Sequence, residues 1–158
     1  MKAFKLLWAV LALTFGLVSF SSCGSDDDDD VATPAARDIA GTYTADMSCS
    51  VMGEASDFEN MTFTVTATSD ATVDITIPTF GEMPMQVPEF TVTGVKVSGA
   101  DGSYTLDTTT FSGTLPNGKS YSGTLQGSYK DSRLSVQFNL QYGAMPMPMI
   151  CSWTAPKN

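Results

Sequence analysis

Sulfur side chains carry most of the chemistry that this sequence could perform. The 158 residues include three cysteines and nine methionines but no histidine. Without histidine there is no Ser–His–Asp or Cys–His nucleophile, no histidine general base and no zinc site built on imidazole. The carboxylates are then the only candidate acids and bases, and most of them fall in predicted turns or on predicted outer faces. We therefore expect no catalytic residues and no enzymatic activity.

The first cysteine, Cys23, ends a segment that is typical of a secretory signal peptide. Lys2 and Lys5 precede an apolar run over residues 6–18, which is shorter than the roughly 20 residues of a membrane-spanning helix. The residues Ser21-Ser22-Cys23-Gly24 resemble a bacterial lipobox. The resemblance implies that residues 1–22 are removed and that Cys23 receives acyl chains such as palmitate. Each buried methylene of such a chain stabilises membrane attachment by ~0.8 kcal/mol.

An acidic block follows the lipobox and consists of Ser25, Asp26, Asp27, Asp28, Asp29 and Asp30. Five adjacent like charges stay solvated, so the simplest interpretation is a spacer. Cys-Gly-Ser followed by an acidic run also resembles the surface-export signal of Bacteroidota lipoproteins. That resemblance implies an outer-membrane protein that faces the cell exterior, with the periplasmic face as the alternative. Residues 23–37 would then be the lipidated cysteine, the export signal and a flexible tether with a reach of roughly 20 Å.

The remaining chain, residues 38–158, alternates between apolar and polar residues with period two. Such alternation predicts strands with one buried and one wet face, as in an antiparallel sheet. Turn signals separate the strands at short intervals, and Gly94 shifts the buried phase by one residue, which predicts a β-bulge. We predict an all-β domain of about eight strands in a closed, antiparallel up-and-down barrel, with a β-sandwich as the alternative. The alternating runs are residues 39–51, 61–68, 73–77 and 134–142, and the turns include Gly53 to Asp57, Ser69-Asp70, Gly99 to Gly102 and Pro116-Asn117-Gly118.

Several segments of this domain resemble the calycin-like lipoprotein domain of Bacteroidota. They are Ile39-Ala40-Gly41-Thr42-Tyr43, the proline-rich residues 77–88, and Ser122-Gly123-Thr124-Leu125. The resemblance covers nearly all of the chain after the tether. It implies a lipocalin-like β-barrel of unknown function and supplies no catalytic residues.

The other two cysteines, Cys49 and Cys151, lie in the first and the last predicted strand. An even pair in an exported chain most simply forms a disulfide, and these two strands are neighbours in a closed barrel. Closing a loop of about 100 residues would stabilise the fold by about 4.7 kcal/mol in the chain-entropy model. Two buried free thiols are the alternative.

Five methionines form two clusters that also contain proline, Glu82-Met83-Pro84-Met85 and Met145-Pro146-Met147-Pro148-Met149. On an extended chain, residues i and i+2 point to the same side, so the second cluster predicts a stripe of thioethers. Proline cannot donate to a sheet, which places the stripe at an edge or at the barrel mouth. Thioethers select Cu(I), but packing in the core or rim, or an adaptable apolar pocket, is the more ordinary role. We assign no metal and no cofactor.

Two functional hypotheses remain. In the first, the barrel binds a small hydrophobic ligand at an open end, and the candidate residues are Phe80, Met83, Met85, Phe90, Met145, Met147, Met149 and Trp153. In the second, side chains fill the barrel and the protein acts through its surface as a structural, adhesion or accessory-subunit module with an unknown protein partner. The net charge of −9 argues against nucleic acid as a partner. The lipid anchor makes the membrane a partner in both hypotheses.

The acidic block leads to the first prediction. Replacing residues 26–30 by alanine should keep the protein membrane-attached but reduce its cleavage by protease added to intact cells. The matched control replaces Cys23, which should release the protein from the membrane fraction. Equal protease sensitivity of the alanine variant and the natural protein would contradict the export role.

Overall fold

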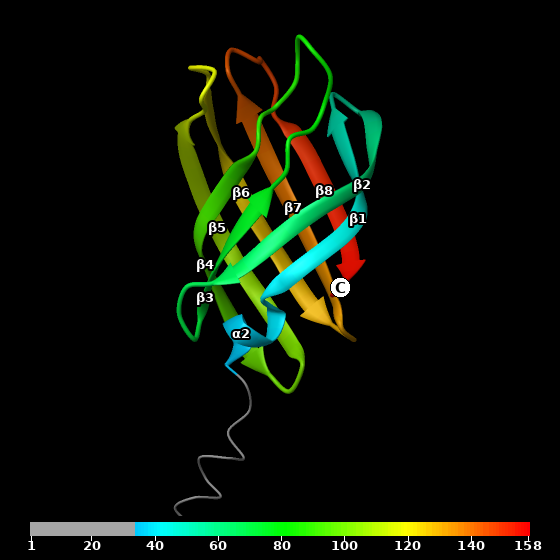
Figure 1. The fold of residues 1–158 in the computed structure, drawn as a ribbon. Coiled ribbons are helices and arrows are strands. Elements are labelled where there is room, and N and C mark those ends of the chain that lie inside the picture. Colours follow the sequence, from blue (N-terminus) through cyan, green and yellow to red (C-terminus); the bar gives the residue numbers. More distant parts are fainter. Residues whose placement is uncertain (1–33) are drawn as a thin grey trace, which may run out of the picture. The chain divides into compact units, whose positions relative to one another are not determined.

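The alternating segments form eight antiparallel strands within residues 34–158, the part of the chain that the computed structural model describes (Figure 1). Each strand pairs with its neighbours in sequence, and β1 also pairs with β8, so the sheet closes into a barrel. This confirms the predicted up-and-down barrel and excludes the sandwich. The predictions for Cys23, Ser25 and residues 26–30 lie outside the described residues. The strands are β1 Gly41–Val51, β2 Glu54–Ala67, β3 Thr72–Ile77, β4 Phe90–Ala100, β5 Ser103–Thr114, β6 Ser120–Lys130, β7 Arg133–Tyr142 and β8 Met149–Pro156.

A one-turn helix, α2 (Ala35–Ile39), precedes β1 and packs against one end of the barrel. Ala36 and Ile39 are three residues apart, so they share a helix face, and both are completely buried. The prediction that the tether extends to Arg37 and that strand alternation starts at Ile39 was wrong here. A five-residue helix is too short to produce a recognisable 3.6-residue period. No helix within residues 34–158 is long and apolar enough to span a membrane.

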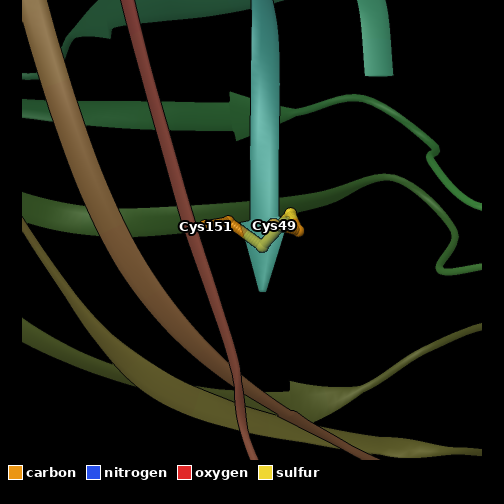
Figure 2. Close-up of a disulfide and its surroundings, with 2 residues drawn as sticks. All are labelled: Cys49 and Cys151. Carbon is orange, nitrogen blue, oxygen red and sulfur yellow. A yellow bond between two sulfur atoms is a disulfide. The ribbon is translucent and has the colours of Figure 1, made fainter. Parts of the chain in front are cut away.

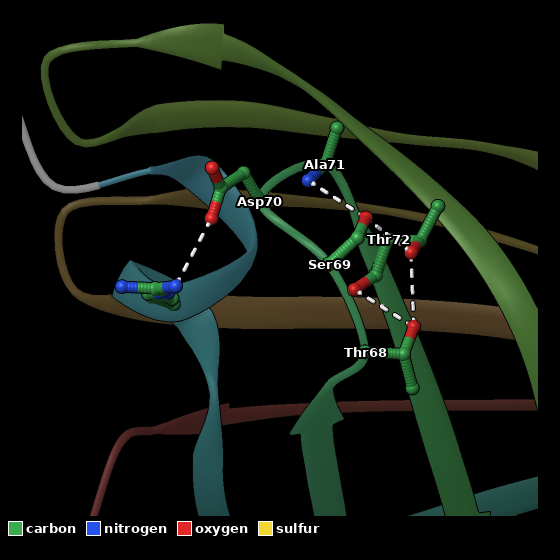
Figure 3. Close-up of polar contacts among 6 residues, drawn as sticks. Thr68, Ser69, Asp70, Ala71 and Thr72 are labelled. Carbon is green, nitrogen blue, oxygen red and sulfur yellow. Dashed lines mark hydrogen bonds and ion pairs between the residues drawn. The ribbon is translucent and has the colours of Figure 1, made fainter.

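The turn between β2 and β3 ties α2 to the barrel (Figure 3). Within the turn, Ser69 Oγ accepts a hydrogen bond from the backbone N–H of Ala71 at 3.2 Å and lies 2.6 Å from Thr72 Oγ1. The carbonyl of Asp70 accepts a hydrogen bond from Ala36 N–H at 3.2 Å. The carboxylate of Asp70 also pairs with Arg37 at 3.3 Å, but both side chains are exposed, so this pair contributes little to stability. The backbone contact and the buried helix face therefore hold α2 in place.

Two turn predictions had different outcomes. Gly94 has a φ of +69°, and the β3–β4 register shifts there, which confirms the predicted bulge. The predicted turn from Gly53 to Asp57 was wrong. Met52 and Gly53 alone make the connection, both with positive φ, as in the two-residue hairpins that match the twist of their strands. Residues 54–57 belong to β2 and are all exposed, so they lack the alternation that would have revealed a strand.

Large apolar side chains fill the barrel interior. Trp153 stacks on Phe63 with a ring-centroid distance of 4.0 Å, and Phe90 packs against Phe111 at 5.7 Å and Phe138 at 6.2 Å. Among the described residues, no polar or charged residue is buried. The interior is therefore a packed core of the kind that small eight-stranded barrels allow.

The disulfide closes the seam between the first and the last strand (Figure 2). Cys49 on β1 and Cys151 on β8 are direct register partners, with Cα atoms 4.0 Å apart, and their sulfurs are bonded. Both residues are buried. This confirms the predicted pairing.

Removing the disulfide should lower stability by raising the entropy of the unfolded chain. Because the cysteines are 102 positions apart in the sequence, the double variant Cys49→Ser, Cys151→Ser should lose about 2–5 kcal/mol of its free energy of unfolding. Urea denaturation of a chain that begins at residue 24 measures the difference, since all eight described strands lie beyond that point. A reductant should destabilise the natural chain and leave the stability of the double variant unchanged. If the reductant did not change the stability of the natural chain, the predicted contribution of the disulfide would be refuted.

Tyr43 predicts a dependence of stability on alkaline pH. Its hydroxyl donates a hydrogen bond to the carbonyl of Ile39 at 2.6 Å inside the barrel. Burial raises the pKa of this hydroxyl well above its usual value of about 10, and Tyr129 and Asp38 raise it further. As the pH rises, this hydroxyl therefore ionises in the unfolded chain before it does so in the folded chain. Its contribution to the free energy of unfolding is complete below about pH 10 and decreases as the pH rises further.

The variant Tyr43→Phe should lose about 1 kcal/mol at neutral pH, because it lacks the hydrogen bond. It should also show a weaker decline above pH 10. Some decline should remain, because a hydrogen bond to Asp38 raises the pKa of Tyr104 as well. Thermal denaturation between pH 8 and pH 11 measures how steeply stability declines with pH in the variant and in the natural chain. An identical decline in both would contradict the role assigned to Tyr43.

Candidate functional site

The end of the barrel opposite α2, which we call the mouth, collects the sequence-predicted ligand residues (Figure 1). Four connections meet there: Met52 and Gly53, residues 78–89, residues 115–119 and residues 143–148. The connections β2–β3, β4–β5 and β6–β7 lie at the α2 end. Of the five large apolar side chains that are exposed in the described part of the chain, four lie in these connections, namely Met52, Met83, Met85 and Met147, and the fifth, Ile150, lies on the outer wall near the start of β8. The mouth is therefore the apolar surface of this domain.

The sheet divides at the mouth because β3 is short. β3 stops at Ile77, and the next residue, Pro78, has no N–H to continue a ladder. β3 pairs with β2 only along residues 64–67 of β2, and β4 pairs with β5 only along residues 97–100 of β4. Toward the mouth, the β3–β4 pair thus separates from both neighbours, so that, among residues 34–158, residues 54–63 of β2 pair with β1 alone.

A hollow of about 750 Å³ lies between β2 and residues 79–85 of the β3–β4 loop, and we call it the mouth hollow. Phe58 and Phe80 meet in it edge to face, with ring centroids 5.4 Å apart. Carboxylates and hydroxyl groups surround this apolar floor. The lining consists of apolar Phe58, Met61, Phe80, Met85 and Met149, together with Ser56, Asp57, Glu59, Thr79, Gly81 and Glu82.

The mouth hollow brings together three of the eight predicted ligand residues: Phe80, Met85 and Met149. Met83 and Met147 lie in the surrounding loops and are 78 % and 44 % exposed. Met145 packs against the core. The candidates Phe90 and Trp153 are buried and belong to the aromatic interior, where they face other rings rather than an open site.

The predicted thioether stripe was wrong. Residues 145–148 form a bent connection, and β8 starts only at Met149. Pro146 and Pro148 prevent the regular pairing that would have aligned the methionines on one side. The three side chains therefore have different environments: Met145 and Met149 are partly buried, and Met147 is exposed.

Two residues of the mouth hollow, Phe58 and Met61, were not among the predicted candidates. Met61 had a visible signal, because it is the first apolar position of an alternating run. Phe58 had none, because it follows the segment assigned to a turn. A bulge in β2 at Asn60, which has a φ of +54°, brings both side chains to the same face of the strand.

The β3–β4 loop holds one wall of the hollow in a defined position. Phe80 and Val87 exchange backbone hydrogen bonds of 3.0 and 2.9 Å, and Met85 N–H donates to the carbonyl of Glu82 at 2.8 Å. The Tyr142 hydroxyl donates to the carbonyl of Gln86 at 3.0 Å. This wall is therefore preformed, which lowers the entropic cost of binding.

The mouth is acidic. It carries Glu54, Asp57, Glu59, Glu82 and Glu89, whereas Lys119 is its one cation among the described residues. The other described cations lie toward the α2 end, and they are Arg37, Lys96, Lys130, Arg133 and Lys157. No group of three or more His, Cys, Asp or Glu residues within residues 34–158 is placed to hold a metal ion.

A second depression of about 600 Å³ crosses the outer wall of the barrel over β5 to β8. Its lining is mostly hydroxyl and amide side chains, which include Thr105, Gln126, Ser135 and Gln137. A polar sheet face of this kind is the ordinary wet side of an antiparallel barrel. The large apolar members of its lining, Leu106, Val136 and Trp153, are at most 3 % exposed, whereas Met85 of the mouth hollow is 53 % exposed, so the mouth hollow is the better candidate.

Comparisons with known proteins agree with this architecture. Residues 39–154 match the family model described as the calycin-like beta-barrel domain. The fold also matches a protein from Bacteroides fragilis NCTC 9343 whose crystal structure is described as that of a "putative outer membrane protein", with a TM-score of 0.69 and 26 % identity. The match covers 79 % of this chain and 53 % of that one, so this chain spans about half of its length. No curated protein matches the sequence.

Proposed function

Because this chain belongs to the calycin-like β-barrel domain family, we propose that it is a lipid-anchored outer-membrane protein that binds an apolar group at its mouth without catalysing a reaction. The likeness to the Bacteroides fragilis protein supports a location in the outer membrane or cell envelope. The lipobox at Cys23 and the acidic block after it support an anchor with the domain on the outer side.

The mouth hollow is the observation that carries this proposal. Its volume of about 750 Å³ falls within the usual range of ligand sites, and its floor is aromatic and thioether-rich. Methionine adapts its shape to an apolar partner at little cost. Because the interior below is packed, the apolar group is held at the mouth rather than deep in the barrel, as it would be in a lipocalin-type carrier.

The proposed anchor would join the domain at the end opposite the mouth. The chain enters the barrel through α2, at the end opposite the mouth. An anchor on Cys23 would therefore be joined to the domain at its α2 end, so the point of attachment would leave the mouth free to meet a ligand.

The filled interior favours a second candidate function, an adhesion or accessory-subunit module. In this case the exposed methionines of the mouth, above all Met52 and Met83 at 78 % exposure each, contact a protein rather than a small molecule. Large exposed apolar patches commonly mark such interfaces. Cu(I) binding remains a minor candidate that rests on the thioethers of Met83, Met85 and Met147 alone.

Nile red, a neutral dye that fluoresces in apolar surroundings, tests the mouth hollow. A chain that begins at residue 24 should bind it, and Met85→Glu should weaken binding about fivefold or more, because a charge then enters the apolar floor. Met83→Glu is the matched control, since Met83 lies in the same loop but outside the lining, and it should bind nearly as the natural chain does. Equal affinities for all three chains, or no binding to the natural chain, would refute the proposal.

A further inference from the structure

We propose that the free edge of β2 beside the mouth hollow pairs with an extended, basic segment of a partner protein, and that an apolar side chain of this segment enters the hollow. This inference rests on the proposed function, because it names what carries the apolar group. The partner is recognised by three properties together: its backbone, its charge and one apolar side chain.

The first property comes from the incomplete pairing of β2. Residues 54–63 pair with β1 on one side, whereas β3 reaches only residues 64–67. The β3–β4 loop does not replace β3 there: among the described residues, its backbone hydrogen bonds from Phe80, Met85 and Val87 all stay within the loop. An unpaired strand edge of this kind is the usual template for strand addition.

The ladder geometry shows which backbone groups face the open edge. The Cα atoms of Cys49 and Cys151 are 4.0 Å apart, a distance typical of a pair that exchanges no backbone hydrogen bonds. The backbone groups of Cys49 therefore point the other way, toward its β2 partner Ser56. Because these directions alternate along a strand, Ala55 and Asp57 direct their N–H and C=O groups to the free edge.

The available edge is short. At Asn60 the backbone has positive φ, and its N–H donates to Asp46 Oδ1 at 3.0 Å on the β1 side. This bulge ends the regular strand, so an added segment would pair along residues 54–59. About six residues of a partner cover that length, since paired strands advance by the same roughly 3.3 Å per residue.

The hollow supplies the second part of the site. Phe58 and Met61 line it from β2, and Phe80 and Met85 line it from the loop. A segment added to the edge would lie between these two walls. Every second side chain of the segment would then face the apolar floor, while the alternate side chains would face solvent.

Charge selects the partner. Asp57, Glu59 and Glu82 line the hollow, Glu54 begins the strand, and no lysine or arginine belongs to the lining. A second copy of this chain would bring the same acids to the edge, and the acidic block at residues 26–30 would bring five aspartates. Charge repulsion therefore disfavours each of these two as the segment that pairs with β2. Charged residues on an edge ordinarily prevent self-association in this way. A basic segment instead gains attraction at every one of these positions.

A labelled peptide, Lys-Leu-Lys-Val-Lys-Leu-Lys, tests the proposal by fluorescence anisotropy with the chain that begins at residue 24. We expect saturable binding that weakens as salt increases. Two changes should each weaken it by about tenfold or more. The first is methylation of alternate backbone nitrogens of the peptide, which keeps its charge. The second is Ala55→Pro, which removes one edge donor while the neighbouring residues keep their pairing with β1.

Matched variants separate specific from general attraction. Asp57→Lys should abolish binding, whereas Asp131→Lys, the same charge change in the β6–β7 turn at the other end, should leave the affinity within about twofold. Circular dichroism checks that each variant keeps its strands. If Ala55→Pro does not fold, the methylated peptide alone decides the backbone contribution.

The possible outcomes distinguish the two proposals. If Nile red binds but the natural and the methylated peptide bind equally or not at all, this inference is overturned and the mouth hollow still stands as an apolar site. If neither the dye nor the peptide binds, both are overturned. If ultracentrifugation shows that the chain dimerises and that Ala55→Pro prevents it, the occupant is a second copy and the basic partner is refuted.

Discussion

The pairing of the first strand with the last is the contact on which the described structure depends. β1 and β8 share a ladder from Met47 to Ser50, and the Cys49–Cys151 bond holds that ladder at its centre. Without it, both strands would be free edges, and the rings of Trp153 and Phe63 would lose the wall that keeps water from them. Closure thus turns a sheet with one apolar face into a core, and the Cys49–Cys151 bond holds the two strands together covalently.

Closure is complete around the α2 end and incomplete at the mouth, and this difference explains where a site can exist. At one end, Ile39 and Ala36 plug the barrel and the β2–β3 turn bonds to the helix backbone. At the other end, Pro78 stops β3 early, so a loop takes the place of a strand beside β2. The early end of β3 at Pro78 therefore leaves the space that forms the mouth hollow. A fully paired barrel with this packed interior would have neither an apolar recess nor an available strand edge.

Sequence periodicity predicted those parts of the fold in which each strand has one wet and one buried face. It therefore found the barrel, the bulge at Gly94 and the partners Cys49 and Cys151. It failed where that contrast is missing: residues 54–57 are exposed on both faces, and α2 is shorter than two turns. The site was harder to predict, because residue type alone does not distinguish Phe80 at the mouth from Phe90 in the core. The prediction of a thioether stripe at residues 145–149 was wrong for a different reason. Residues spaced by two share one side only when the chain is extended, and Pro146 and Pro148 prevent an extended strand there.

The unequal distribution of charge between the two ends has an electrostatic consequence. Among the described residues, the mouth carries five acids against Lys119 alone, whereas the cations toward the α2 end are nearly balanced there by Asp38, Asp70, Asp101 and Asp131, so the excess negative charge is concentrated at the mouth. A cation that approaches the domain is therefore attracted to the mouth more than to the other end, over the roughly 10 Å that such fields reach at 0.1 M ionic strength. The mouth thus favours the approach of positively charged ligands before any contact forms, and this electrostatic steering should weaken as the ionic strength rises.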